Sequence, residues 1–78
     1  MAVSFVLMHV SPTLENDVLN HLSKLDEVVD IHPLFGEYNL MAKIEAKEYE
    51  NIGNIIINKI RTINGIIDTT TLTGINMH

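Results

Sequence analysis

The chain has 78 residues, 46% of them hydrophobic, and ten acidic against five basic residues give it a net charge of -5. This length leaves room for a single hydrophobic core and the negative charge opposes a phosphate backbone, so we expect one domain over residues 1–78 that does not bind nucleic acid directly. Cysteine is absent, which excludes disulfides and thiolate zinc sites and leaves oligomerisation as the expected way to stabilise so small a core.

The first predicted element is a strand over Val3 to Val10. It is apolar at nearly every step, whereas a strand of a sheet covered on one side should alternate apolar and polar residues. We therefore expect a second copy of the chain to cover its other face, although an edge strand with scattered exposed apolar residues is an alternative. The run Ala2 to Val10 is too short to span a bilayer and has no basic leader, so we expect a cytoplasmic protein without a membrane partner.

Two segments have the apolar spacing of amphipathic helices. The first, Ser11 to Leu25, starts with Ser11 as the predicted N-cap and Pro12 at the first helical position. The second, Glu48 to Ile63, is followed by Gly65, which is expected to end it. Each segment places four aliphatic residues on one helix face: Leu14, Val18, Leu22 and Leu25 in the first, and Ile52, Ile56, Ile60 and Ile63 in the second.

Three further strands are predicted over Val28 to Phe35, Tyr38 to Ala46 and Ile66 to Ile75, because these runs are rich in β-branched or aromatic residues and end at Gly, Pro or polar clusters. Only Gly36-Glu37 separates the first two of these runs, which predicts a hairpin in which Gly36 takes a backbone angle that other residues resist.

An internal repeat supports the resulting order βαββαβ. A shift of 38 residues carries the first helical stripe onto the second, and it also superimposes Asp30 on Asp68, Leu34 on Leu72, and Gly36 on Gly74. Two βαβ halves with right-handed crossovers combine most simply into a ferredoxin-like α+β fold. We therefore predict a four-stranded antiparallel sheet with both helices on one face, paired through its other face into a dimeric α/β sandwich.

The sequence contains no motif for catalysis or metal binding. The four histidines, His9, His21, His32 and His78, are dispersed, and no pair has a spacing that directs two imidazoles at one ion. There is no cysteine nucleophile, no Gly-x-Ser-x-Gly elbow and no phosphate-binding loop. We expect no catalytic residues, no metal and no cofactor.

Two segments are instead candidates for a binding site. In Phe35 to Leu40, a glycine turn can present backbone amides beside the polar groups of Tyr38 and Asn39. In Asp68 to Thr73, hydroxyls line one face of a strand at repeats of about 6.6 to 7 Å, from Thr69, Thr71 and Thr73. Such amides and hydroxyls can bind both ends of a small zwitterion, but from composition alone turn chemistry and β-propensity explain these residues slightly better.

At these two segments the chain resembles the C-terminal effector-binding (RAM) domain of the Lrp/AsnC family of transcription regulators, and the resemblance spans nearly all 78 residues. Val28-Val29-Asp30 leading into Phe35-Gly36-Glu37-Tyr38-Asn39-Leu40 is similar to the family's Gly-Asp/Glu-Tyr/Phe-Asp hairpin. Ile63-Asn64-Gly65-Ile66-Ile67-Asp68-Thr69-Thr70-Thr71 is similar to its Pro-Gly-Val segment followed by Thr-x-Thr.

The resemblance implies a homodimer that assembles into rings, often of eight or ten chains, with small effectors, usually amino acids, bound between dimers. It places Gly36, Tyr38 and Asn39 on the hairpin side of the pocket and Thr69 and Thr71 on the strand side. Asn39 stands where the family usually has Asp, and Asn64 where it usually has Pro. The effector preference is therefore expected to differ.

The family's helix-turn-helix half has no counterpart in these 78 residues. The resemblance therefore points to a stand-alone module that affects transcription or metabolism indirectly, through its own assembly or by mixing with full-length Lrp/AsnC regulators. The sequence leaves the effector, the ring size and the regulated pathway open.

Three other interpretations remain at this point. An ACT-type amino-acid sensor shares the order βαββαβ but usually has a glycine at its first strand–helix junction, where this chain reads Val10-Ser11-Pro12-Thr13. A small dimeric ferredoxin-like barrel enzyme would need an acid–base group such as His9 or His32 in a cavity. A purely structural subunit would assemble without responding to any metabolite.

Overall fold

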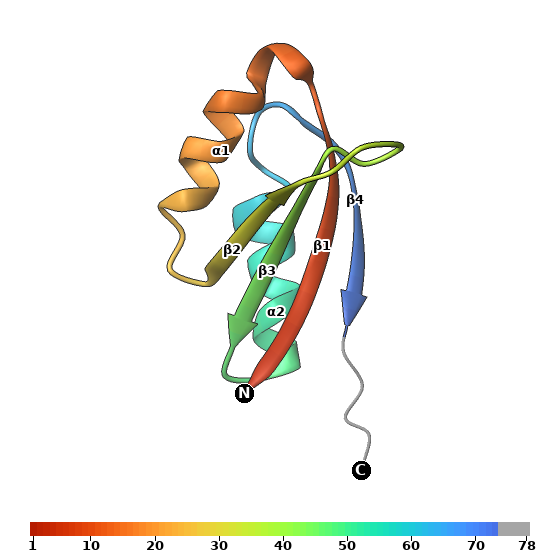
Figure 1. The fold of residues 1–78 in the computed structure, drawn as a ribbon. Helices are drawn as coiled ribbons and strands as arrows, with labels where there is room; N and C mark the ends of the chain where they lie inside the picture. Colours follow the sequence, from red (N-terminus) through yellow and green to blue (C-terminus); the bar gives the residue numbers. More distant parts are fainter. Residues whose placement is uncertain (74–78) are drawn as a thin grey trace.

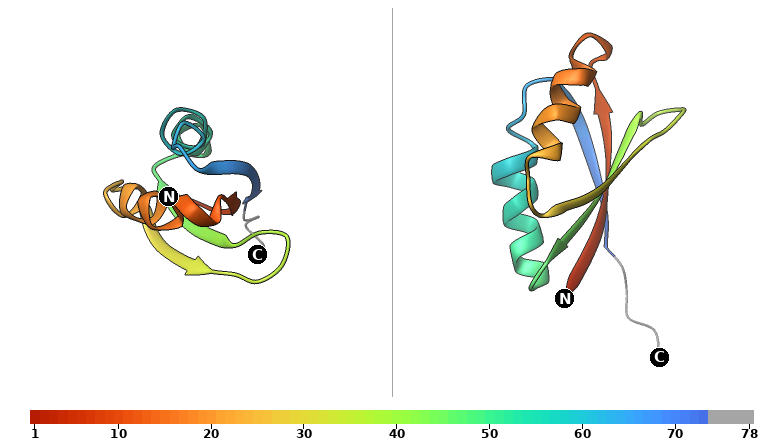
Figure 2. Two further views of the ribbon diagram at one scale, coloured as in Figure 1. Left: turned by 90° about the horizontal axis from the view of Figure 1, so that it is seen from above. Right: turned by 60° about the vertical axis from the view of Figure 1, so that its left-hand side comes forward.

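The structure, a computed structural model, describes residues 1–73. The elements in chain order are β1 (Ala2–Val10), a 3₁₀ turn η1 (Pro12–Leu14), α1 (Glu15–Ser23), β2 (Val28–Pro33), β3 (Leu40–Ala46), α2 (Tyr49–Ile55), a π-helical turn η2 (Ile56–Ile60) and β4 (Ile66–Thr73). The strands form one antiparallel sheet in the order β2-β3-β1-β4. Both helices cover one face of this sheet and leave the other face open (Figure 1, Figure 2). The predicted ferredoxin-like α+β fold is confirmed.

The central strand β1 has two apolar faces, which explains its nearly continuous hydrophobic sequence. The helix-covered face belongs to the core and is buried at every second residue: Ala2, Ser4, Val6, Met8 and Val10. On the open face, Val3, Phe5 and Leu7 are only partly buried. The register places Phe5 opposite Leu72 of β4 and Leu7 opposite Met41 of β3, but it also places Phe5 opposite Lys43 of β3. The apolar character therefore continues into β4 at Leu72 and into β3 only at Met41.

The first helical segment starts at Pro12 as predicted, but its first turn is the 3₁₀ turn η1. Ser11 occupies the N-cap position, yet its hydroxyl makes no capping hydrogen bond and lies 3.2 Å from the hydroxyl of Thr13. The predicted N-cap position of Ser11 is confirmed, although its side chain makes no capping hydrogen bond. The backbone N–H of Ser11 donates to the carbonyl of Gly65 at 2.8 Å, which ties the start of this helix to the turn before β4.

The second helical segment is interrupted by a wider turn. Its predicted stripe Ile52, Ile56, Ile60 and Ile63 is buried throughout, but the regular helix α2 ends at Ile55 and continues as η2 to Ile60. In η2 the N–H of Arg61 donates to the carbonyl of Ile56 at 2.8 Å, across five residues instead of four. Neither helix in the described part of the chain is long and apolar enough to cross a bilayer.

The connection between β2 and β3 is longer than predicted. β2 ends at Pro33 and β3 begins at Leu40, so residues 34–39 form a loop in place of a turn made of Gly36-Glu37 alone. Gly36 has the positive φ expected of it, +114°. The predicted extension of the last strand to Ile75, and with it Gly74 and His78, lies outside the described residues.

Candidate functional site

The loop between β2 and β3 is fastened to the end of β1 by Asn39. The N–H of Asn39 donates to the carbonyl of Met8 at 3.0 Å. Its side-chain Oδ1 accepts from the N–H of Val10 at 2.8 Å, and its Nδ2 donates to the carbonyl of the same residue at 2.9 Å. β3 begins only at Leu40. The side-chain amide of Asn39 therefore makes the hydrogen bonds to β1 that a backbone peptide would make if β3 began earlier. Asn39 therefore positions the loop, with its own polar atoms already engaged.

Tyr38 reaches from the same loop to the edge strand β4. Its hydroxyl lies 2.6 Å from the hydroxyl of Thr70, in a partly buried contact. The register pairs Thr70 with Leu7, which faces away from the helices, so this contact lies on the open face of the sheet. Thr70 was not among the predicted site residues, because the Thr-x-Thr pattern draws attention to its neighbours.

The three other threonines of β4 lie on the opposite face, towards the helices. The register pairs Thr69, Thr71 and Thr73 with Met8, Val6 and Ser4 of the core face, and the hydroxyls of Ser4 and Thr73 are 3.0 Å apart. The prediction that these threonines share one face is confirmed.

These threonines form one wall of a groove of about 500 Å³ between β4 and the α2–η2 segment, which we name the β4–η2 groove. Ile52 and Ile56 are buried along it and Ile57 is exposed. Arg61, directly after η2, also lines it. Ile57 and Arg61 were not among the predicted site residues. The sequence signal for them is an isoleucine next to the helical stripe and a basic residue at the end of the same segment.

The five predicted site residues therefore fall on two sides of the sheet. The loop with Gly36, Tyr38 and Asn39 contacts the end of β1 and the open face, whereas Thr69 and Thr71 line the β4–η2 groove. The sheet separates the two sets within one chain.

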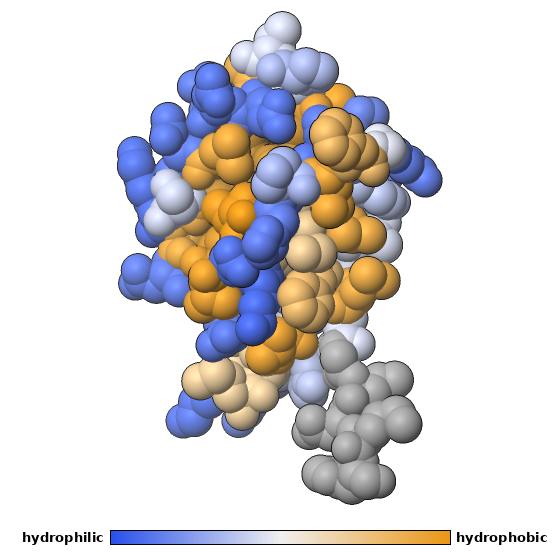
Figure 3. Space-filling view, in the orientation of Figure 1, coloured by the Kyte–Doolittle hydropathy of each residue, from blue (hydrophilic) through white to orange (hydrophobic). Residues whose placement is uncertain are grey.

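The open face carries an apolar surface beside a polar one. Figure 3 shows hydrophobic surface over β1 and β4 next to a hydrophilic band that follows β3. The apolar part includes Val3, Phe5 and Leu7 of β1 and Leu72 of β4. An apolar patch with a polar border is typical of a protein–protein interface.

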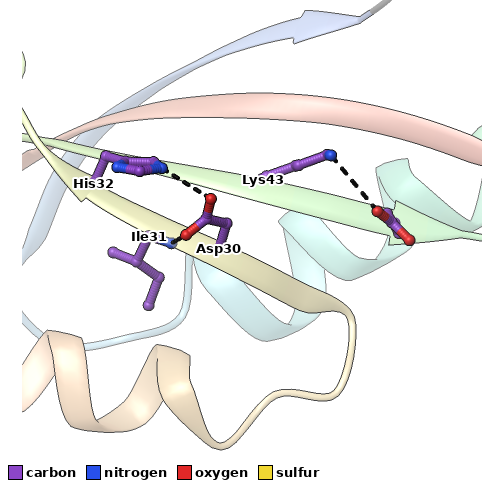
Figure 4. A network of polar contacts seen from close by, with 5 residues as sticks. Asp30, Ile31, His32 and Lys43 are labelled. Atoms are coloured by element: carbon purple, nitrogen blue, oxygen red, sulfur yellow. Dashed lines mark hydrogen bonds and ion pairs between the residues drawn. The ribbon is translucent and has the colours of Figure 1, made fainter.

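A polar network lies on the open face of β2 and β3 (Figure 4). Nε2 of His32 is 2.8 Å from Oδ2 of Asp30, and Nζ of Lys43 is 3.8 Å from the carboxylate of Glu45. The hydrogen bond from His32 lowers the pKa of Asp30 below its usual value. His9 is exposed and neither it nor His32 lines the β4–η2 groove. Residues 1–73 contain no cluster of potential metal ligands.

Comparisons with known proteins agree on one family. The family model described as the Lrp/AsnC ligand binding domain matches residues 3–76. An uncharacterized HTH-type transcriptional regulator of Pyrococcus abyssi is 31% identical over 72 residues, which cover 88% of this chain and 48% of that protein. The chain thus spans about half the length of the curated relatives it matches.

Solved structures show the same relationship. The crystal structure of FFRP-DM1 has a TM-score of 0.91 and 31% identity, and the match covers 96% of this chain and 100% of that one. The structure of Escherichia coli AsnC has a TM-score of 0.90 and 27% identity, with 97% of this chain and 52% of that chain covered.

Proposed function

Because the chain belongs to the Lrp/AsnC ligand-binding domain family, we propose that it is an effector-binding and oligomerisation module that binds a small amino acid or a related metabolite between dimers. The observation that carries this proposal is the division of the predicted site. The loop with Gly36 and Tyr38 and the groove with Thr69 and Thr71 lie on different sides of the sheet, so assembly of several chains is what would complete the pocket.

The proposed dimer forms through the open face of the sheet. Stacking two such faces would bury Val3, Phe5, Leu7 and Leu72 of both copies, and a symmetric contact of this kind uses the same surface twice. Dimers would then associate into a ring, with eight or ten chains as the sizes that the family resemblance suggests.

The proposed effector contacts follow from which polar groups are free. The amide of Asn39 is occupied by Val10, so its proposed part in the site is to hold the loop in place. Backbone amides around Gly36 and the hydroxyls of Thr69 and Thr71 would bind the carboxylate and ammonium groups. The isoleucines of the β4–η2 groove would contact an apolar side chain.

The proposed module acts on transcription or metabolism indirectly. Its net charge of -5 disfavours contact between these residues and DNA. A ligand that bridges two dimers stabilises the assembled state by its differential affinity for that state. The effect of ligand binding would then be transmitted through the contacts between subunits, including those in mixed oligomers with full-length regulators of the family.

An enzymatic role has less support. Relatives of the chain are named HTH-type transcriptional regulators, and the acid–base candidates His9 and His32 do not line the β4–η2 groove. Membership of the Lrp/AsnC family also favours the proposed effector-binding module over an ACT-type sensor.

The test combines native mass spectrometry with thermal melts across the twenty amino acids. We expect at least one amino acid to raise the melting temperature and to shift the subunit distribution towards the larger oligomer. Thr69→Val with Thr71→Val should abolish both effects, because valine keeps the shape and removes the hydroxyls. Thr13→Val, on the exposed turn η1, is the matched control. A protein that responds to no amino acid in either measurement would contradict the proposal.

A further inference from the structure

A second groove lies on the other side of the α2–η2 segment from the β4–η2 groove. It has a volume of about 460 Å³ and lies between this segment, the connection from α1 to β2 and the end of β3 (Figure 1, Figure 2). The two grooves share no lining residue. We name the second one the asparagine groove. Its polar lining residues are Glu27, Lys47, Asn51, Asn54, Asn58 and Lys59.

The three asparagines form a stripe along one face of the α2–η2 segment. Asn51, Asn54 and Asn58 follow one another at steps of three and four residues, the spacing of neighbours on a helix surface. Asparagine is less favourable in a helix than glutamine, glutamate, lysine or alanine, which suit a solvated helix face better. Asn58 also belongs to the π-helical turn η2, and turns of this kind often occur at functional sites. Helix stability alone therefore does not explain the stripe.

Two of these side-chain amides have no partner within the described chain. Asn51 has a structural part, because its Oδ1 accepts from the N–H of Glu48 at 3.2 Å. The amides of Asn54 and Asn58 make no hydrogen bond with another residue of the range 1–73, although the backbone carbonyl of Asn58 accepts from the hydroxyl of Thr62. Each amide can donate and accept at once, so the two suit a ligand whose hydroxyl groups do the same.

The groove also holds one lysine whose charge is not neutralised. Nζ of Lys59 is 2.6 Å from the carboxylate of Glu27, whereas Lys47, exposed directly after β3, takes part in no ion pair within the residues that the structure describes. The chain has ten acidic and five basic residues, so a free cation beside three amides is a local exception to its negative charge. A lysine ammonium group binds phosphate and carboxylate groups as a point charge.

We propose that the asparagine groove binds a small organic anion that carries several hydroxyl groups, such as a sugar phosphate or a sugar acid. Lys47 binds the phosphate or carboxylate, and Asn54 and Asn58 bind the hydroxyls. The volume of the groove is in the range of small-molecule sites. An amino acid fits less well, because its ammonium group needs an acceptor and the carboxylate of Glu27 already binds Lys59. This second ligand site does not depend on the effector binding proposed above.

The test is isothermal titration calorimetry of the full chain with four compounds: a hexose phosphate, a hexuronate, the unmodified hexose and inorganic phosphate. We expect at least one of the two hydroxylated anions to bind saturably, and the one that does identifies the anionic group. The neutral hexose and inorganic phosphate should bind at least about tenfold more weakly, because each offers only one of the two kinds of contact. Saturable binding of none of the four compounds would overturn the proposal. Inorganic phosphate that binds as tightly as the hydroxylated anions would also overturn it.

A lysine substitution tests the contact with the anionic group. Lys47→Gln should weaken binding of the hydroxylated anion at least about tenfold, because it removes the unpaired charge. Lys24→Gln, at an exposed lysine directly after α1 and outside the groove, removes the same charge and should bind like the wild type. Equal losses in the two variants would mean that net charge, and not the groove, governs binding.

An asparagine pair tests the contact with the hydroxyls. Asn54→Ala with Asn58→Ala should also weaken binding at least about tenfold, while thermal melts show stability that is kept or raised, because alanine is the better helix former. Asn16→Ala with Asn20→Ala, two exposed asparagines with the same spacing on α1, is the matched control and should bind normally. An affinity that is unchanged in the Asn54 and Asn58 double variant would overturn the proposal.

Discussion

The side-chain amide of Asn39 bonds to both backbone polar groups of Val10, accepting at 2.8 Å through Oδ1 and donating at 2.9 Å through Nδ2. A side chain thereby supplies a pair of hydrogen bonds that normally joins two strands. The loop it carries is held against the sheet at the point where β3 has not yet begun. The geometry of the loop tip, including Phe35 and Gly36, depends on this pair.

Replacing Asn39 by aspartate should destabilise the protein at neutral pH. The carboxylate can still accept from Val10 N–H, but it loses the donor and faces the Val10 carbonyl with a negative charge. The free energy of unfolding should fall by about 1–3 kcal/mol at about pH 7, as measured by urea denaturation. Asn54→Asp, an exposed substitution on α2, should cost much less. Equal stability of the two variants would show that the Nδ2 bond is unimportant.

Two glycines should respond in opposite directions to alanine. Gly65 has a φ of +109°, and a Cβ there would lie 2.8 Å from Leu14 Cβ and 2.9 Å from Val18 Cγ2. Gly65→Ala should therefore cost about 1–3 kcal/mol through overpacking, with backbone strain in addition. Gly53 lies in α2 with nothing within 4 Å of its added Cβ, so Gly53→Ala should stabilise by about 0.5–1 kcal/mol. Thermal melts of both variants decide this, and a shift of the same sign in both would refute it.

The contact between Tyr38 and Thr70 should be measurable as a coupling. Tyr38→Phe and Thr70→Val each remove one of two hydroxyls that lie 2.6 Å apart. We expect a double-mutant cycle on the free energy of unfolding to give a coupling of about 0.5–1.5 kcal/mol. Tyr38→Phe combined with Thr62→Val, whose hydroxyl donates to the carbonyl of Asn58, serves as an uncoupled comparison. Strict additivity in the first pair would mean that the hydroxyls do not interact in solution.

The ion pair between Glu27 and Lys59 should make stability depend on pH in the acidic range. Nζ of Lys59 lies 2.6 Å from the carboxylate of Glu27, and this hydrogen bond lowers the pKa of Glu27 from its ordinary value of 4.5. A lowered folded-state pKa adds stability above the unfolded-state pKa, and that stability is lost as the pH falls through the folded-state value.

Lys59→Gln should therefore be less stable than the wild type at neutral pH, and the difference should disappear once the pH is below the folded-state pKa of Glu27. Urea denaturation across the acidic range measures this. Lys47→Gln, at an exposed lysine that is in none of the ion pairs found in residues 1–73, should show no such pH-dependent difference. A gap between Lys59→Gln and the wild type that is constant with pH would rule out the linkage.

Two glutamate substitutions should separate the two proposed contacts between copies. Phe5→Glu places a charge on the apolar part of the open face and should yield monomers, because it opposes the stacking of two sheets. Ile57→Glu places the same charge in the β4–η2 groove and should leave the dimer intact while blocking larger assemblies. Sedimentation velocity distinguishes the species, and circular dichroism verifies that both variants are folded. A dimer that survives Phe5→Glu would place the dimer contact elsewhere.

Much of the fold could be predicted because it depends on local patterns. The helical stripes ending at Leu25 and Ile63, the four strands and the positive φ of Gly36 all follow from residue spacing and backbone preference. Predictions failed where a longer-range contact took over. The predicted two-residue hairpin turn is instead a loop whose last residue, Asn39, is bonded to β1.

The sequence alone was enough to establish that alternate threonines of β4 share a face, because successive side chains of a strand point in opposite directions. Only the tertiary structure decided which face that is. Pairing with β1 turns Thr69 and Thr71 towards the helices and leaves Thr70 to meet Tyr38 on the open side. Strand alternation is a property of the backbone, but which side of a strand is covered depends on how the strand joins the sheet, and β4 is oriented by its pairing with β1 at the other end of the chain.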